Sequence, residues 1–145
     1  MSGRILHFLK VYLIFALVAV SVNVMFMELI IAPLIAPEHQ KIIAEYGWEY
    51  FISNIIFGAT ILFMLLSLVG TVLFLKTNYT AKRMGILSII CGFALEFAFM
   101  QPEWAQDILS LSITGDAIGA VIVSSLYWFI PWGIPAYILH KYLKK

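Results

Sequence analysis

Long apolar stretches alternate with short polar segments along the whole chain. The apolar stretches cover residues 11–35, 50–75, 84–100 and 117–139. An α-helix rises 1.5 Å per residue, so about 20 residues cross the roughly 30 Å apolar core of a bilayer. Each stretch approaches or exceeds that length. The pattern therefore predicts an all-α integral membrane protein, with residues 1–145 forming a single domain, a bundle of four transmembrane helices.

The third stretch is the shortest and contains Glu96, so its assignment needs support from its flanks. Lys82 and Arg83 precede this stretch, whereas Glu103 and Asp107 follow it. If residues 84–100 did not cross the membrane, these basic and acidic groups would share one side, and the charge segregation along the chain would be lost. We therefore predict that this stretch is also a span.

Basic residues gather in the segments that the four spans place on one side. When the N-terminus is cytoplasmic, Lys41 alone lies outside, and the cytoplasmic side carries Arg4, Lys10, Lys76, Lys82, Arg83, Lys141, Lys144 and Lys145. Short cytoplasmic segments are enriched in Lys and Arg because of the positive-inside rule. We therefore predict that both termini are cytoplasmic and that the chain is a multi-pass protein of the plasma (inner) membrane.

Both predicted outer loops contain a helical signal. Residues 37–47 begin with Pro37, carry Glu38 in the first turn and end at Gly47, as helices commonly do. After Pro102, apolar residues recur at helical spacing at Trp104, Ile108 and Leu111. We expect a short helix in each loop, lying in the outer membrane interface.

Composition excludes several classes of protein. The chain is 63% hydrophobic and 12% charged, against about 45–50% and about 25% in soluble domains. A net charge of +1 without a long basic run argues against a nucleic-acid partner. The single cysteine, Cys91, leaves no internal disulfide. No histidine lies at membrane depth to hold a haem, so no cofactor is predicted.

Glu96 is the polar residue that most needs an explanation. It lies about 15 Å along the helix from Ile86, close to the middle of the membrane, where a charge costs roughly 2.5–3.5 kcal/mol. No Lys or Arg occurs at that depth, so we expect Glu96 to be protonated or to face a polar cavity. Glu28, Asn54 and Asp116, near the outer ends of the other spans, are its candidate companions in a proton or cation site. A single structural hydrogen bond between helices is the alternative role for Glu96.

The fourth stretch carries the residues that suggest helix packing. Glycines at 115 and 119 permit close approach of another helix. Farther along, two prolines interrupt an aromatic segment, and each frees a carbonyl four residues earlier. The predicted packing or interface residues are Gly115, Gly119, Trp128, Phe129 and Trp132.

The sequence lacks the motifs of common catalytic or metal centres, such as HExxH, GxSxG and CxxC. We therefore predict no metal site and favour a non-catalytic, accessory subunit of a larger membrane complex. An alternative is a small proton- or cation-coupled transporter that uses the buried glutamate. A weaker alternative is a quinone-binding or enzymatic membrane subunit. The expected partners are the lipid bilayer and other transmembrane subunits or further copies of this chain.

Overall fold

The computed structural model describes residues 2–77, 80–100, 102–112 and 115–142, and these ranges are almost entirely helical, with no strand among them. Three helices are long and apolar enough to cross a membrane: Gly3–Leu34, Pro37–Thr77 and Ala117–Tyr142. The prediction of a helical membrane protein is confirmed at this level. The fourth span, and the side on which the termini lie, stay predictions.

The chain forms four helical columns. In order, the elements are α1 (Gly3–Val18), η1 (Ala19–Ile31), α2 (Ala32–Ile35), α3 (Pro37–Tyr50), η2 (Phe51–Ile56), α4 (Phe57–Thr77), α5 (Ala81–Leu95), η3 (Glu96–Met100), α6 (Glu103–Leu109) and α7 (Gly115–Tyr142). The three η segments are wound in wide π-type turns and continue the helices beside them. Such turns are rare in proteins and are frequent at functional sites.

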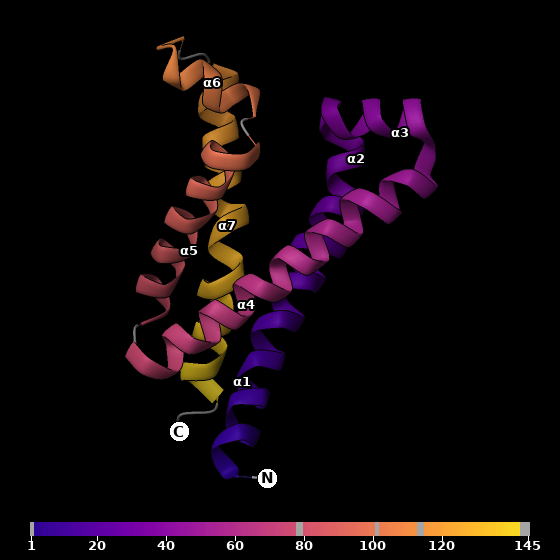
Figure 1. Ribbon diagram of the computed structural model, residues 1–145. Helices are drawn as coiled ribbons and strands as arrows, with labels where there is room; N and C mark the ends of the chain where they lie inside the picture. The colour runs from indigo at the N-terminus through magenta and orange to yellow at the C-terminus, as the bar shows by residue number, and fades with distance from the viewer. Residues whose placement is uncertain (1, 78–79, 101, 113–114, 143–145) are drawn as a thin grey trace.

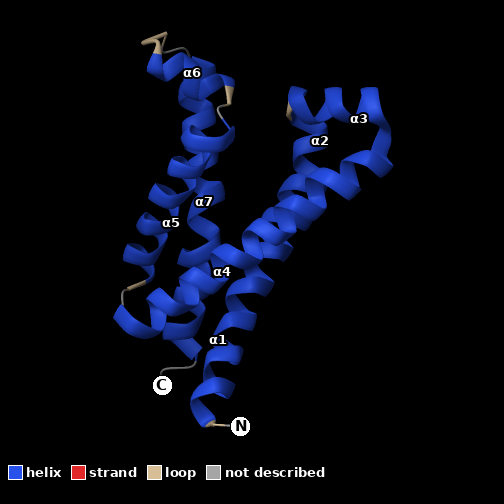
Figure 2. Cartoon of the chain, viewed as in Figure 1, coloured by secondary structure: helices blue, strands red, loops and turns tan. Residues whose placement is uncertain are grey.

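The columns form two pairs that share one end of the molecule. In Figure 1, α5 runs beside α7, while the α1–η1 column crosses α4. The helix α1 begins, and α7 ends, at the same end of the molecule. At the opposite end, which we call the distal end, the α2–α3 hairpin lies apart from α6 and the start of α7. Figure 2 shows that the connections between the columns contain little loop.

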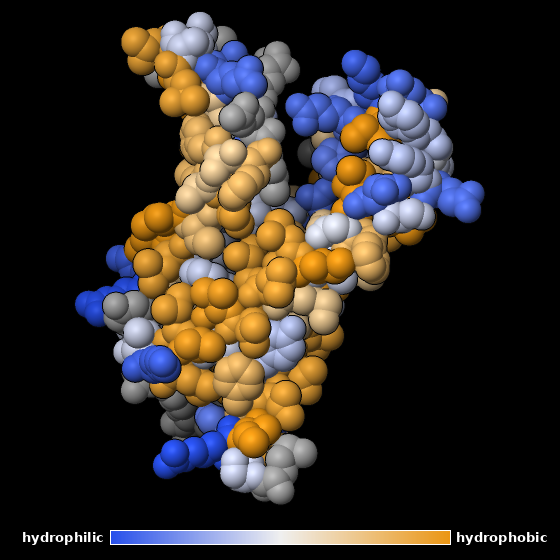
Figure 3. Space-filling view, in the orientation of Figure 1, coloured by the Kyte–Doolittle hydropathy of each residue, from blue (hydrophilic) through white to orange (hydrophobic). Residues whose placement is uncertain are grey.

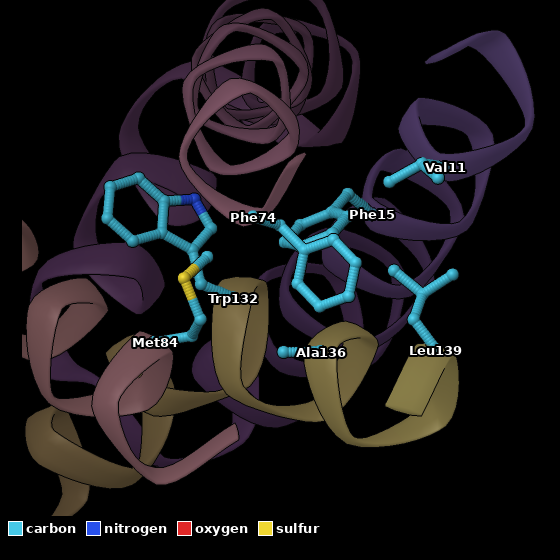
Figure 4. Packing of buried hydrophobic residues seen from close by; sticks show 7 residues of the cluster. All are labelled: Val11, Phe15, Phe74, Met84, Trp132, Ala136 and Leu139. Carbon is cyan, nitrogen blue, oxygen red and sulfur yellow. The ribbon is translucent and has the colours of Figure 1, made fainter. Parts of the chain in front are cut away.

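Apolar side chains from all four columns join them near the end that carries the termini. Figure 4 shows this cluster, in which Phe15 of α1 and Phe74 of α4 face α7, with ring centroids 5.9 Å apart. Its buried members are Val11, Phe15, Phe74, Met84, Trp132, Ala136 and Leu139. A second cluster toward the distal end contains Ala19, Val24, Phe51, Ile56, Phe63 and Trp128. These two clusters pack the two helix pairs against each other where the pairs cross.

Glycines on α5 allow the aromatic residues of α7 to pack closely. A Cβ added at Gly85 would lie 2.0 Å from Phe129, and one added at Gly92 would lie 2.1 Å from Trp128. Such distances are far below van der Waals contact, so a side chain at either position would displace the ring. The small residues of α5 therefore set the separation of α5 and α7.

The aromatic residues of α7 pack inside the chain. Trp128 and Trp132 are only 2% and 3% exposed, and the Trp132 indole donates to the Leu66 carbonyl at 2.8 Å. Together with Phe129 they act in helix packing, but within this chain; the two tryptophans offer almost no surface to a partner. By contrast, among the described residues a Cβ at Gly115 or Gly119 meets nothing within 4 Å.

Both short helices expected in the loops are present. The helix α3 begins at Pro37 and contains a break at Gly47, whose φ of 88° lies in the left-handed region that favours glycine. The helix α6 covers Glu103–Leu109 and stops two residues before Leu111, where φ is 60°. The predicted stop signal at Gly47 therefore marks the point where the chain turns from the loop helix toward η2.

Candidate functional site: a polar cluster between the helix pairs

Glu28 lies at the centre of a cluster of polar side chains in the distal half. Its Oε2 atom is 2.9 Å from His39 Nε2, and its Oε1 atom accepts a hydrogen bond of 2.8 Å from the Tyr127 hydroxyl. Both carboxylate oxygens are thus engaged. One glutamate links η1 to α3 within its own helix pair and to α7 in the other pair.

The return of the chain at Ala36 brings His39 to Glu28. Ala36 is extended, with φ −89° and ψ 114°, and Pro37 then starts α3 with a fixed φ. The His39 ring also packs edge-on against Phe51, with centroids 5.5 Å apart. Because the Glu28 carboxylate accepts from its ring, the pKa of His39 is raised above its usual value, and the nearby charge of Glu38 acts in the same direction.

Asn23 serves a backbone group that a proline has left free. Pro131 has no N–H to donate to the Tyr127 carbonyl, the usual acceptor four residues earlier. The Asn23 Nδ2 atom donates to that carbonyl at 2.6 Å, and Asn23 is completely buried. The predicted free carbonyl therefore has a partner on another column, and α7 remains helical through both prolines.

Glu96 approaches this cluster from α5. It is the first residue of η3 and is partly buried. Its carboxyl group lies near the Trp128 indole and acts electrostatically on Glu28 and Tyr127. The two glutamates that the sequence places in different spans are therefore close enough to act on each other electrostatically.

Four buried polar atoms in the described part of the chain lack a hydrogen-bond partner, and all belong to this cluster. They are Asn23 Oδ1, His39 Nδ1, Glu96 Oε2 and Trp128 Nε1. Buried polar atoms in proteins are nearly always paired with protein groups or water.

Two other predicted companions of Glu96 have different outcomes. Asn54 on η2 is exposed, and its amide donates to the Tyr50 carbonyl of its own helix at 3.0 Å. This hydrogen bond holds the Asn54 side chain against its own helix, so Asn54 does not join the cluster. Asp116 belongs to the first turn of α7, but its side chain lies outside the described residues.

The sequence reasoning assigned none of His39, Tyr127, Asn23 and Trp128 to this cluster, although it predicted Trp128 as a packing or interface residue. A signal existed for Asn23, since it is a polar residue in an apolar stretch and a proline in another span frees a carbonyl. His39 gave no such signal, because its contact with Glu28 depends on the direction that α3 takes after Ala36. Tyr127 and Trp128 look like ordinary apolar filling until the rotation of α7 is known.

The cluster combines carboxylates, an imidazole and a phenol, which can bind and exchange protons. Within the described ranges, no three His, Cys, Asp or Glu side chains gather closely enough to hold a metal ion. Comparison with models of known protein families, with curated proteins and with solved structures found no match for this chain.

Proposed function

We propose that this protein is a four-span protein of the plasma membrane, with both termini in the cytoplasm, and that it serves as a non-catalytic subunit of a larger membrane complex. The fourth span in this proposal is α5 continued by η3, which runs beside α7. The strong bias of Lys and Arg toward the segments at the end carrying the termini supports the orientation. The distal end is then the outer one.

The separation of the two helix pairs at the distal end carries the subunit proposal. Figure 3 shows an open notch between the lobe of α2 and α3, whose hydrophilic surface comes from α3, and the column of α5, α6 and α7. Transmembrane helices associate through close packing and small residues. In the distal half, the two helix pairs of this chain do not pack against each other. A helix of a partner protein could provide the packing surface there.

The start of α7 offers a surface that suits such a partner. Gly115 and Gly119 lie one turn apart with open space above each. Large apolar residues follow on the same helix, and Ile118, Ile122 and Leu126 are all more than half exposed. A helix that packs there would bury the apolar area of these side chains, and the described residues leave the space above both glycines open to it.

Purification in mild detergent followed by native mass measurement tests the subunit proposal. We expect the wild-type chain to retain transmembrane partners in fixed stoichiometry. The substitution Gly119→Leu fills the open surface of α7 and should release them, whereas Gly58→Leu, at an equally open glycine of α4, is the matched control. A monomeric wild-type chain, or equal loss of partners in both variants, would contradict the proposal.

The polar cluster supports a second candidate, a small proton- or cation-coupled transporter. Glu28 and Glu96 come together with an ionisable histidine between helix pairs that separate toward one side. Intramembrane carboxylates of this kind mark ion and proton pathways in other membrane proteins. In liposomes, Glu96→Gln should abolish pH-dependent flux while Glu49→Gln, on the exposed surface of α3, should leave it intact. Absence of flux from the wild-type chain would remove this candidate.

A further inference from the structure

Exposed cations surround the end of the molecule that carries the termini. The apolar cluster at this end joins the four columns (Figure 4), and one buried residue from each column is, in chain order, Val11, Phe74, Met84 and Leu139. Within two residues of these along the chain stand four exposed cations: Lys10, Lys76, Arg83 and Lys141. The cluster therefore brings the four cations to one end. Together with the exposed Arg4 and Lys82, we call them the basic rim.

No acidic residue accompanies the basic rim in the sequence. All eight Asp and Glu residues of the chain lie between positions 28 and 49 or between positions 96 and 116. The positive-inside rule explains where Lys and Arg lie, but it does not explain this absence, because Asp and Glu have little influence on orientation. The charge of the rim therefore favours association with anions from outside the chain.

The polarity of the helices does not explain the cations at the starts of α1 and α5. A helix N-terminus carries a partial positive charge, so a cation in the first turn is unfavourable. Arg4 lies in the first turn of α1, Lys82 and Arg83 lie in the first turn of α5, and neither turn contains an acidic residue. An anion bound at the rim would offset this repulsion.

Two tyrosines at the end of α7 indicate the depth of the rim in the membrane. Tyr137 and Tyr142 are 51% and 62% exposed, and Lys141 Nζ lies 5.6 Å from the centroid of each ring. Exposed tyrosines gather where a membrane protein passes from the apolar core to the headgroups. The rim therefore lies at the depth of lipid headgroups.

Apolar side chains lie beside the cations in a pattern that suits a phospholipid. About one helical turn from a rim cation, on the side of the apolar core, each of three helices has an exposed apolar residue. These pairs are Lys10 with Leu13, Lys76 with Val72, and Lys82 with Ile86. Residues three or four apart share a helix face, so a lipid could place its headgroup at the cation and its acyl chain along the apolar residue.

We propose that the basic rim binds anionic phospholipids of the leaflet that covers the end carrying the termini. The phosphate groups lie against the exposed cations, and the acyl chains lie along the apolar side chains one turn away. Basic clusters directly beside membrane spans attract anionic lipids in this way. The proposal concerns the contacts of this chain with lipid, so it holds for a complex subunit and for a transporter alike.

Electron paramagnetic resonance of spin-labelled lipids tests the rim in the full chain, reconstituted in phosphatidylcholine bilayers. The amount of spin-labelled phosphatidylglycerol that the protein immobilises, compared with spin-labelled phosphatidylcholine, gives the ratio of the two binding constants. A cation close to an anionic headgroup strengthens binding about fivefold, so we expect a ratio of about five for the wild-type chain. The ratio should fall toward one in about 1 M salt, where the Debye length is about 3 Å.

Variants of the four rim lysines locate the effect. Lys10→Gln, Lys76→Gln, Lys82→Gln and Lys141→Gln, combined in one chain, should lower the ratio at least roughly twofold. The matched control replaces the same four lysines by Arg, which keeps the charge and should keep the ratio. Lys41→Gln removes an exposed cation at the distal end and should also keep the ratio.

The salt dependence of the wild-type chain keeps the test decisive if the Gln variant does not fold. A wild-type ratio near one, or a ratio that 1 M salt does not lower, would overturn the proposal. So would a Gln variant that retains the wild-type ratio, or a loss in Lys41→Gln as large as the loss in the Gln variant. Because the ratio is measured without partners or flux, its failure leaves the tests of the subunit and of the transporter unaffected.

Discussion

At the scale of single residues, Glu28 is the polar group in the distal half that connects the most elements among the described residues. It accepts from His39 on one side and from Tyr127 on the other. Its side chain is only 18% exposed, so these contacts are shielded from water, which strengthens them. The contact between His39 and Glu28 therefore joins α3 to the rest of the bundle.

The attachment of α3 should weaken as the pH rises. The Glu28 hydrogen bond raises the pKa of His39, so the charged pair stabilises the docked helix fully below the ordinary histidine value of about 6.5, and this stabilisation is lost as the pH rises through the raised value. A hydrogen bond to a charged group contributes about 2 kcal/mol, or roughly 30-fold in the opening equilibrium. Hydrogen exchange of the α3 amides measures it.

Two substitutions make that measurement specific. His39→Gln should remove the pH dependence of exchange in α3, whereas Lys41→Gln, on an exposed position of the same helix, should preserve it. Exchange that remains independent of pH between 5 and 9 in the wild-type chain, after correction for intrinsic rates, would show that the ion pair does not hold α3.

From the sequence it was easier to predict which polar residues need a hydrogen-bond or charge partner than to predict which residues those partners are. Glu96 was identified from its depth and Glu28 from its position near the end of a span, and in the structure the two carboxyl groups act on each other electrostatically. Asn54 was expected there for the same reason but serves its own helix. The difference lies in how each helix is rotated about its own axis, because this rotation decides whether a side chain faces a neighbouring helix or the lipid. In a span that is apolar on all sides, the sequence has no periodic pattern that would indicate the rotation.

At the scale of elements, helix α7 depends on a neighbouring column for its continuity. The carbonyl that Pro131 leaves free is served by Asn23 of η1, and the Ser88 hydroxyl of α5 donates to the next carbonyl, that of Trp128. Side chains from two columns thus replace or supplement the backbone ladder where it is weakest. This explains why polar residues at positions 23 and 88 are buried in otherwise apolar helices.

A double-mutant cycle should detect the link between Asn23 and Pro131. Asn23→Leu leaves the Tyr127 carbonyl buried without a donor, which costs about 1–3 kcal/mol in unfolding free energy. In a Pro131→Ala background the new N–H at position 131 can serve that carbonyl, so the same substitution should cost less. Asn54→Leu, at an exposed asparagine, is the control and should show no such coupling. Unfolding by SDS in mixed micelles provides the free energies, and additive effects at positions 23 and 131 would refute the link.

The lengths of the elements were predicted better than their local winding. Apolar stretches and the stop at Gly47 place the helices correctly, because they depend on local composition and on one positive φ. The wide π-type turns of η1 and η3, which carry Glu28 and Glu96, have no counterpart in the sequence pattern. Such turns depend on contacts between columns, and a single sequence does not report those contacts.

At the scale of the whole molecule, the arrangement of charge and shape agrees with a single orientation in the membrane. The end that carries α1's start and α7's end has most of the Lys and Arg residues, and the polar helix α3 lies at the other end. Between these ends the surface is largely apolar (Figure 3). An inverted orientation would place the basic residues outside, against the positive-inside rule.

Thiol labelling of intact cells tests this orientation directly. Cys91 is first replaced by Ala, so that each introduced cysteine is the only thiol, and the introduced sites are exposed positions: Ser2 near the start of α1, Gln40 on α3 and Gln106 on α6. A reagent that cannot cross the membrane should label the cysteines at positions 40 and 106 but not the one at position 2, which should react only after the cells are opened. Labelling at 40 but not at 106 would place α6 on the cytoplasmic side and remove α5 with η3 as a span. Labelling at position 2 in intact cells would reverse the orientation, and the polar cluster would then open toward the cytoplasm.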